Sequence, residues 1–285
     1  MTVETAITGT AAGVPFVAVP PTGGAADAPV VLAWHLMDPP RTEAALAAAL
    51  PLAGLEAWRI YLGLPMHGAR FPGGGVDALM QLGFADAVLN LYGPISAQAA
   101  EECGPAYVEL RERFGFRDGP VGVLGGSLGS AVAQLVVAGG AFDVAAAVLV
   151  SPVSQLEAVV ATVGRMLGVD YPWSEPSLEV ARRMDFVARA GEVATCPATL
   201  FVVGEEDDEQ GFREPATRLR AELARREVVT GLVVVPGMGH AFAEEPGIEP
   251  APQLPAAAEV DRLAVDWFAR YLRPSLSRSG PGLPG

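Results

Sequence analysis

Residues 121–129 read Val-Gly-Val-Leu-Gly-Gly-Ser-Leu-Gly. The first four residues form an apolar, strand-like run that leads directly into Gly125-x-Ser127-x-Gly129, and a helix-like stretch follows over residues 130–138. This order of strand, Gly-x-Ser-x-Gly and helix is the nucleophile-elbow pattern, in which a serine occupies a sharp turn and its hydroxyl stands clear of the sheet. The pattern makes Ser127 a candidate nucleophile.

The two glycines of this pattern have a steric reason. Side chains two residues before and after the serine would crowd the turn, and Gly125 and Gly129 remove them. The helix that follows directs free N–H groups and the positive end of its dipole at the serine, so the backbone N–H of Leu128 is a candidate donor to an oxyanion. Because the chain has 33 glycines, the alternative is a glycine-rich loop without catalytic significance.

Length and composition limit the class of protein. The 285 residues suffice for one large α/β domain, and we expect a single domain over residues 1–285. Hydrophobic residues make up 51% of the chain, yet no run of about 18 apolar residues occurs, so no membrane span is expected. The net charge of −14 argues against nucleic acid as a partner, because phosphate binding needs a basic surface.

The N-terminus and the cysteines indicate the compartment. The first residues have neither the basic nor the long apolar region of a signal peptide. Cys103 and Cys196 are far apart in the sequence, match no metal-binding spacing and are expected to be reduced and buried. These features are typical of a cytoplasmic protein, and they leave its oligomeric state open.

Strand-like and helix-like segments alternate along the chain. Eight segments have the composition of strands, at residues 3–8, 14–19, 30–34, 58–64, 121–124, 145–150, 199–203 and 232–235. A short loop containing Gly9 and Gly13 joins the first two strands as in an antiparallel hairpin. From the third strand onward helical stretches intervene, at residues 42–50, 97–114, 128–138, 212–226 and 256–272. The alternation predicts an α/β fold, a mostly parallel eight-stranded sheet with helices on both faces.

Two of the connections between predicted strands are longer than ordinary loops. Residues 73–91 are expected to hold an extra short helix, and residues 155–190 two or three short helices between strands six and seven. Insertions of this length are often lids, so residues 155–190 are a candidate helical lid. Its Tyr171 and Trp173, with Met166 and Leu167, are expected either to line a substrate pocket or to form the lid's own small core. The Pro- and Gly-containing tail, residues 279–285, is expected to be mobile.

An acid and a histidine follow later strands. The seventh strand ends in Gly-Glu-Glu-Asp-Asp at residues 204–208, and the eighth leads to Gly-Met-Gly-His at residues 237–240. The carboxyl ends of parallel strands meet at one edge of a sheet, so Ser127, His240 and one of these acids are expected to lie together. The order Ser…Asp…His is the one that the elbow predicts. Asp207 is preferred from its offset to the strand; the alternatives are Asp208, Glu206 and Glu205.

These motifs resemble those of the α/β-hydrolase superfamily. The run at residues 125–129 resembles its nucleophile elbow, residues 196–200 with Gly204-x-x-Asp207 resemble its acid strand and loop, and residues 237–242 resemble its histidine loop. Residues 64–68 are similar to the loop after its fourth strand. The resemblance spans nearly the whole chain and is greatest to small esterases and dienelactone-hydrolase-like enzymes, although the latter often carry cysteine where this chain has Ser127.

The resemblance implies a serine hydrolase that cleaves a carboxylic ester or thioester of a small molecule. Ser127 would be the nucleophile, His240 the general base and Asp207 its orienting acid, with no metal and no organic cofactor. The alternatives are an acyltransferase with the same triad, an amidase or peptidase, and a non-catalytic binder on the same fold.

The loop after the third strand departs from the family pattern. The family usually has His-Gly-x there, the N–H of x being the second oxyanion donor, whereas this chain reads His35-Leu36-Met37. By position Met37 supplies the donor, and Leu36 in place of glycine implies a differently shaped oxyanion hole or a narrower pocket. Expected pocket residues are Leu36, His35, Met238, Phe242, Tyr171 and Trp173. Both His35 and His67 are more often structural than catalytic in such positions.

Overall fold

One eight-stranded sheet forms the centre of the molecule. The computed structural model of the protein describes residues 6–23, 27–117, 119–192 and 196–272. The strands are β1 (Ile7–Ala11), β2 (Val14–Val19), β3 (Val30–Trp34), β4 (Trp58–Leu62), β5 (Val121–Gly126), β6 (Val144–Val150), β7 (Ala198–Gly204) and β8 (Thr230–Val235). Their order is β1-β2-β4-β3-β5-β6-β7-β8; β2 is antiparallel to both neighbours, and the pairs from β4 to β8 are parallel. The mostly parallel sheet predicted from the sequence is confirmed.

The hairpin between β1 and β2 is tighter than the sequence led us to expect. Strand β1 runs on through Gly9 to Ala11, so the loop expected to begin at Gly9 is wrong. Only Ala12 and Gly13 connect the strands, with φ of 47° and 81°, as the twist of a two-residue hairpin requires. Gly9 pairs instead with Phe16, whose ring would lie 3.3 Å from a Cβ atom at residue 9. Residues 3–5 of the expected strand lie outside the described residues.

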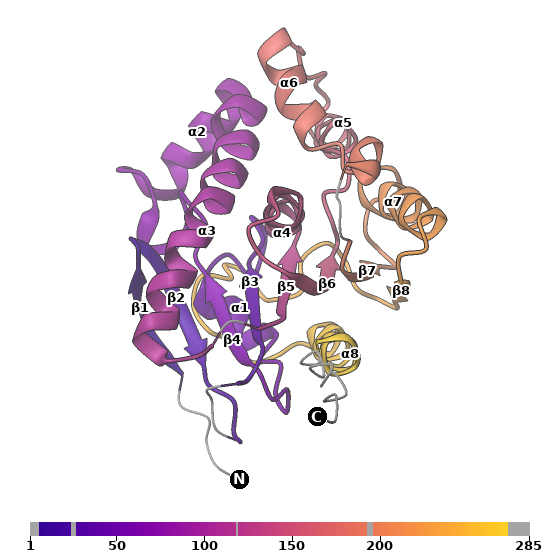
Figure 1. Ribbon diagram of the computed structural model, residues 1–285. Coiled ribbons are helices and arrows are strands. Elements are labelled where there is room, and N and C mark those ends of the chain that lie inside the picture. The colour runs from indigo at the N-terminus through magenta and orange to yellow at the C-terminus, as the bar shows by residue number, and fades with distance from the viewer. Residues whose placement is uncertain (1–5, 24–26, 118, 193–195, 273–285) are drawn as a thin grey trace, which may run out of the picture.

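Helices cover both faces of the sheet, as predicted (Figure 1). One face packs against α3 (Gly93–Phe114), α4 (Leu128–Gly139) and α7 (Glu214–Arg225). The other face packs against α1 (Glu43–Ala49) and α8 (Pro255–Tyr271). Each face therefore has its own hydrophobic core, and the edge at which the parallel strands end is left for the loops.

The last helix shows how closely these layers meet. Phe268 of α8 is fully buried, and its ring would lie 2.8 Å from a Cβ atom at Gly122 of β5. Trp267 donates a hydrogen bond from Nε1 to the carbonyl of Ala198 at 3.0 Å. The glycine lets the aromatic ring of α8 rest directly on the strand that leads to Ser127.

Two inserted segments rise above the sheet on either side of α4 (Figure 1). The first contains α2 (Gly75–Ala87), a helix of 13 residues that is kinked at Asp86, and η2 (Val88–Tyr92), which continues into α3. The second contains α5 (Leu156–Leu167), α6 (Glu175–Arg183) and η3 (Ala188–Gly191) between β6 and β7. Tyr171 joins the two segments, because its hydroxyl donates a hydrogen bond to Asp86 Oδ1 at 2.5 Å.

No helix in the described part of the chain has both the length and the apolar character that a membrane span requires. The tail, residues 279–285, lies outside the described residues.

We predict that Phe268→Ala lowers the free energy of unfolding by about 3–5 kcal/mol, because it opens a cavity over Gly122 in a fully buried layer. Denaturant unfolding of both proteins measures the difference. Phe84→Ala is the matched control: Phe84 on α2 is 74% exposed, so the same truncation should change stability by no more than about 0.5 kcal/mol. Equal losses in the two variants would contradict the packing assignment.

Candidate active site

Ser127 occupies a strained turn between β5 and α4. Its φ of 44° and ψ of −118° lie where residues with a side chain are rarely found. A Cβ atom at Gly125 would lie 2.2 Å from the Gly129 carbonyl oxygen, and one at Gly129 would lie 2.4 Å from the carbonyl oxygens of Trp34 and His35. Both glycines are therefore required by close backbone contacts, which hold the serine at the carboxyl end of the sheet.

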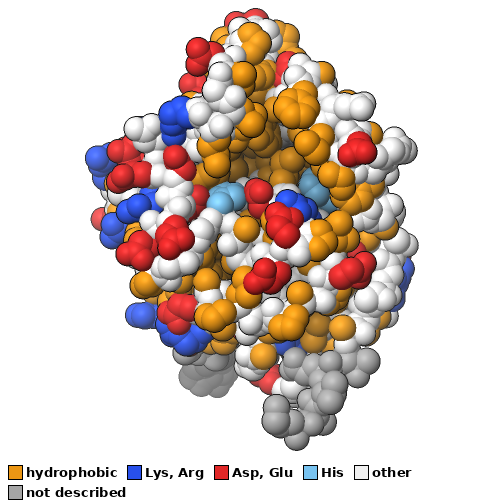
Figure 2. All heavy atoms as spheres, turned by 180° about the vertical axis from the view of Figure 1, so that it is seen from behind, with side chains coloured by type: hydrophobic (Ala, Val, Ile, Leu, Met, Phe, Trp, Pro, Cys, Tyr) orange, Lys and Arg blue, Asp and Glu red, His pale blue; other side chains and the backbone are white. Residues whose placement is uncertain are grey.

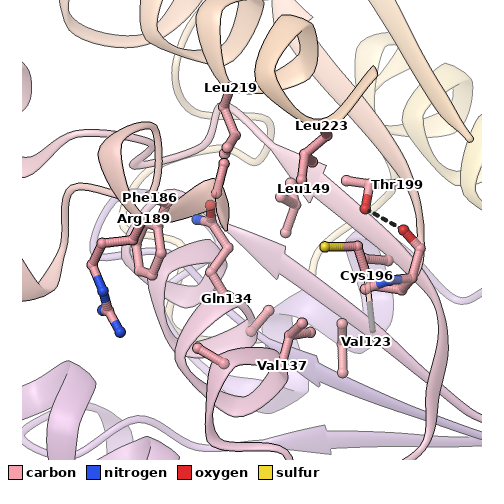
Figure 3. Close-up of a pocket in the computed structure, with 15 residues that line it drawn as sticks. Val123, Gln134, Val137, Leu149, Phe186, Arg189, Cys196, Thr199, Leu219 and Leu223 are labelled. Atoms are coloured by element: carbon pink, nitrogen blue, oxygen red, sulfur yellow. Dashed lines mark hydrogen bonds between the residues drawn. The ribbon is translucent and has the colours of Figure 1, made fainter. Parts of the chain in front are cut away.

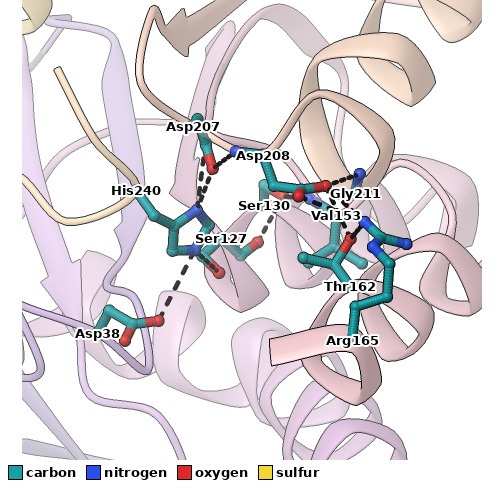
Figure 4. A network of polar contacts seen from close by, with 10 residues as sticks. All are labelled: Asp38, Ser127, Ser130, Val153, Thr162, Arg165, Asp207, Asp208, Gly211 and His240. Carbon is teal, nitrogen blue, oxygen red and sulfur yellow. Dashed lines mark hydrogen bonds and ion pairs between the residues drawn. The ribbon is translucent and has the colours of Figure 1, made fainter. Parts of the chain in front are cut away.

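Three polar side chains form a hydrogen-bonded chain at this edge (Figure 4). His240, in the loop after β8, lies with Nε2 2.8 Å from Ser127 Oγ. Its Nδ1 lies 3.1 and 3.2 Å from the two carboxylate oxygens of Asp207, in the loop after β7. We call Ser127, His240 and Asp207 the triad. The structure brings together the three residues that the sequence placed after separate strands.

The surroundings of His240 favour its charged form. Burial lowers the pKa of His240, but the hydrogen bond to Asp207 and the negative charges of Asp207 and Asp38 outweigh burial and raise it above the usual value. The ring of Phe212 packs beside the imidazole, with 4.1 Å between ring centroids. Asp207 is only 5% exposed and also accepts a hydrogen bond from the N–H of Asp208 at 2.9 Å. The negative charges of Asp207 and Asp38 would therefore stabilise an imidazolium at His240 without the help of solvent.

Asp208 faces away from His240 (Figure 4). Its Oδ1 accepts hydrogen bonds from Thr162 Oγ1 at 2.8 Å, from Arg165 at 3.0 Å and from the N–H of Gly211 at 2.7 Å. Partial burial raises the pKa of Asp208, but these three donors together hold it below its usual value. Asp208 thus caps η4 (Glu209–Arg213) and anchors α5, while Glu205 binds the N–H of Gly237. These contacts separate Asp207, which faces His240, from Asp208 and Glu205, two of the alternatives that the sequence left open.

The loop after β3 accommodates Leu36 by pointing it into the core. Leu36 is fully buried, and its Cδ1 would lie 2.2 Å from a Cβ atom at Gly126. Because Gly126 has no side chain, the Leu36 side chain can occupy the space beside it. Leu36 therefore does not narrow the cleft. Leu128 is the first residue of α4, so its N–H stands outside the intrahelical hydrogen bonds. That Leu128 and Met37 bind an oxyanion remains a prediction.

Four expected pocket residues lie in the core and not along the cleft. His35, Leu36, Met238 and Phe242 are at most 1% exposed, because the backbone of both loops turns their side chains under the sheet edge. Tyr171 and Trp173 are half-buried and pack against each other, with 4.7 Å between ring centroids, on a groove along the outer side of α5. Met166 and Leu167, at the end of α5, are 80% and 58% exposed.

His35 is a structural residue, as its position predicted. Its Nδ1 donates to the carbonyl of Leu36 at 2.7 Å, and its Nε2 accepts from the N–H of Leu64 at 3.0 Å. Complete burial and the neighbouring His67 lower the pKa of His35 to about 3, since a second proton would displace the Leu64 bond. His67 is also buried and bonds the carbonyl of Pro65 at 2.9 Å. These contacts fix the loop that carries Met37.

The molecular surface is hollowed on one face (Figure 2). Hydrophobic side chains line the hollow, and histidine and acidic side chains lie along its lower border. Of the three histidines, His240 is the one with appreciable exposure, 23% of its side chain. His240 is therefore the triad member that solvent reaches most readily, since Ser127 and Asp207 are 7% and 5% exposed.

A separate cavity of about 60 Å³ lies behind α4 (Figure 3). Apolar side chains of α4, β6 and α7 line it, with Gln134 as a polar member. Gln134 Nε2 donates to the carbonyls of Ser130 and Val153, both at 3.0 Å. Ser130 in turn donates to the Ser127 carbonyl at 2.6 Å, so this network supports the elbow from below while the cavity itself contains no triad residue.

Two residues beside the triad were missed by the sequence analysis. Asp38 Oδ2 lies 3.7 Å from His240 Nε2, on the side opposite Asp207 (Figure 4). Its place directly after Met37 was the one signal that could have indicated it. Phe212, in η4, carries no motif, and only the folded loop brings it to His240.

No protein-family model and no curated protein matches the chain. Solved structures do match it. Carboxyl esterase 2 of the mycorrhizal fungus Tuber melanosporum is 17% identical, with a TM-score of 0.58 over 95% of this chain and 87% of that one. The dienelactone hydrolase of Anabaena variabilis is 19% identical, with a TM-score of 0.55 over 95% and 99%. An acylaminoacyl peptidase of Pyrococcus horikoshii is 12% identical, with a TM-score of 0.60 over 99% of this chain but only 43% of that one.

The strand order and these superpositions agree. The chain has the α/β-hydrolase fold. In the α/β-hydrolase fold the nucleophile, the acid and the histidine follow one another along the chain, as Ser127, Asp207 and His240 do here. The resemblance that the motifs indicated is confirmed for the fold.

We predict that His35 makes the protein less stable in acid. Its folded-state pKa of about 3 lies below the unfolded value of 6.5, so its contribution is complete above pH 6.5 and is lost as the pH falls toward 3. The free energy of unfolding should fall by up to about 1.4 kcal/mol per pH unit from this proton alone. Denaturant unfolding between pH 7 and pH 4 measures it. His35→Asn should be less stable at pH 7 but have a shallower pH dependence, and an unchanged slope would contradict the assignment.

Proposed function

We propose that the protein is a serine hydrolase that cleaves a carboxylic ester or thioester of a small molecule through an acyl-enzyme on Ser127. The observation that carries this proposal is the unbroken hydrogen-bonded chain from Ser127 Oγ to His240 Nε2 and from His240 Nδ1 to Asp207. A buried acid, a half-buried imidazole and a serine on a strained elbow are the parts that acyl transfer needs.

In the first half of the reaction Ser127 Oγ attacks the acyl carbon. Its proton passes to His240 Nε2, which is already within hydrogen-bond distance at 2.8 Å. The Asp207 carboxylate stabilises the resulting imidazolium, consistent with the raised pKa of His240. The imidazolium then gives the proton to the leaving alcohol or thiol, and the acyl group stays on the serine. In the second half, water attacks the acyl-enzyme with His240 again as base.

The negative oxygen of each tetrahedral intermediate needs donors. The N–H of Leu128 at the start of α4 and the N–H of Met37 in the loop after β3 are the groups we assign to it. Each such donor typically contributes roughly 3 kcal/mol to the transition state. The dipole of α4 would add to their effect, since its N-terminus begins directly after Ser127.

An ester or thioester substrate is favoured over a peptide by the extent of the structural matches. The carboxyl esterase and the dienelactone hydrolase are matched over 87% and 99% of their length. The acylaminoacyl peptidase is matched over only 43% of its length, so most of that protein has no counterpart in this chain. Our proposal therefore follows the neighbours whose whole chain this protein resembles.

We predict that a fluorophosphonate forms one adduct on the pure protein, on Ser127, and that Ser127→Ala abolishes both the adduct and ester turnover. Loss of the nucleophile of such a triad lowers kcat by the order of 10⁶-fold. Mass spectrometry and hydrolysis of a p-nitrophenyl butanoate measure the two effects. Ser154→Ala is the matched control, because the buried Ser154 hydroxyl has no hydrogen-bond partner in the described part of the chain. Wild-type turnover in Ser127→Ala would refute the proposal.

We further predict that the two adjacent aspartates behave differently. Asp207→Asn removes the charge that orients and stabilises His240, and kcat/KM should fall by roughly 10⁴-fold. Asp208→Asn weakens the cap of η4 and the contact with Arg165, so its effect should be a lower melting temperature with activity kept within about tenfold. A greater fall in kcat/KM in Asp208→Asn than in Asp207→Asn would show that the acid is assigned to the wrong residue.

A further inference from the structure

Asp38 is a carboxylate at the mouth of the site that the catalytic chain does not require. Its Oδ2 lies 3.7 Å from His240 Nε2, the nitrogen that faces Ser127 Oγ, whereas Asp207 holds the opposite nitrogen. About half of the Asp38 side chain is exposed. It follows directly after Met37, one of the two residues assigned to the oxyanion. A group that leaves from the acyl carbon with a proton from His240 Nε2 must therefore pass beside this carboxylate.

No arginine of the described residues forms an ion pair with Asp38, although Arg41 donates from Nε to the carbonyl of the preceding Met37 at 2.9 Å. The sequence contains no lysine, so arginines provide all 19 basic residues. Arg41 pairs with Glu245 at 2.6 Å, Arg165 pairs with Asp208 at 3.0 Å, and Arg213 binds the carbonyl of Glu205 at 3.3 Å. Within the described residues, the one ion-pair contact of Asp38 is that with His240.

The negative charge of Asp38 also acts on Tyr92, a largely buried residue. The pKa of Tyr92 is raised to about 12, mainly by burial and in addition by the negative charge of Asp38. Tyr92 ends η2, the segment that lies beside the site between α2 and α3. A carboxylate at this position attracts an ammonium group through its negative charge.

We propose that the site prefers esters or thioesters whose leaving group carries a positive charge, that is, derivatives of amino or quaternary-ammonium alcohols and thiols. The ammonium group lies against Asp38 while the acyl group points into the apolar hollow. An anionic leaving group is disfavoured at the same position, since Asp38 repels it and no arginine of the described residues forms an ion pair with Asp38. This inference rests on the proposed hydrolase activity and adds the class of its leaving group.

The test compares two esters of one acid that differ only in charge: choline butanoate and its carbon isostere, 3,3-dimethylbutyl butanoate. The measured quantity is the ratio of their kcat/KM values at low ionic strength. We expect the wild-type protein to prefer the choline ester by about fivefold, as for one partly exposed ion pair, and the preference to shrink at high salt. In Asp38→Asn the ratio should fall to about one.

Asp143→Asn is the matched control. Asp143 is an exposed aspartate just before β6, at the amino end of the sheet, so it removes the same charge far from the triad edge. This variant should keep the wild-type ratio. A wild-type ratio of one or below, or an unchanged ratio in Asp38→Asn, would overturn the inference. An equal fall in kcat/KM for both esters in Asp38→Asn would overturn it too, because Asp38 would then act only through His240.

A second readout does not depend on the acyl group. Choline should slow the fluorophosphonate labelling of Ser127 at lower concentration than 3,3-dimethylbutanol does, and Asp38→Asn should remove the difference; equal protection by the two alcohols in the wild-type protein contradicts the inference. Failure of the proposed function has a different signature, since neither labelling of Ser127 nor turnover of any ester would then occur.

Discussion

The positive φ of Ser127 is the constraint on which the rest of this site depends. A serine holds such a backbone conformation only where its neighbours leave no other, and here the Gly125 and Gly129 backbones lie too close for any side chain. Behind them the Ser130 hydroxyl and the Gln134 amide tie the elbow to the end of β6. The strain at one residue is thus supported by packing on both sides of the sheet.

Parallel strands bring this local geometry together with two other loops. Because β5, β7 and β8 all end at one edge, three loops separated by up to 113 residues place one polar group each within hydrogen-bond distance. The same edge concentrates negative charge, and only some of it is compensated. Asp207 is matched by His240 and Asp208 by Arg165, whereas Asp38 has only the far nitrogen of the same histidine.

The elbow, the alternation of strands and helices and the positions of Asp207 and His240 were predictable because each depends on local pattern: strand, turn, helix. The direction of side chains in irregular loops was not. Leu36 was expected in the pocket, yet it packs into the space left by Gly126, a pairing of residues 90 apart in the sequence that no local pattern encodes. The role of Asp208 likewise depends on Thr162 and Arg165 of an inserted helix, which only the folded chain brings to it.

The inserted segment has two parts, and α5 is the part that hydrogen bonds attach to the loop of Asp207 and Asp208. Arg165 and Thr162 tie α5 to Asp208, and a Cβ atom at Gly211 would already lie 2.5 Å from Thr162 Oγ1. A displacement of α5 would therefore also shift the loop that holds Asp207 and disturb the triad. Beyond Gly168, whose φ of 69° ends the helix, the chain contacts the other inserted segment through the Tyr171–Asp86 hydrogen bond, the Ser96–Met184 contact and the packing of α6 on η2. No hydrogen bond of residues 169–190 in the described part of the chain reaches residues 204–208, so the link between the insertion and the acid loop depends on α5 alone.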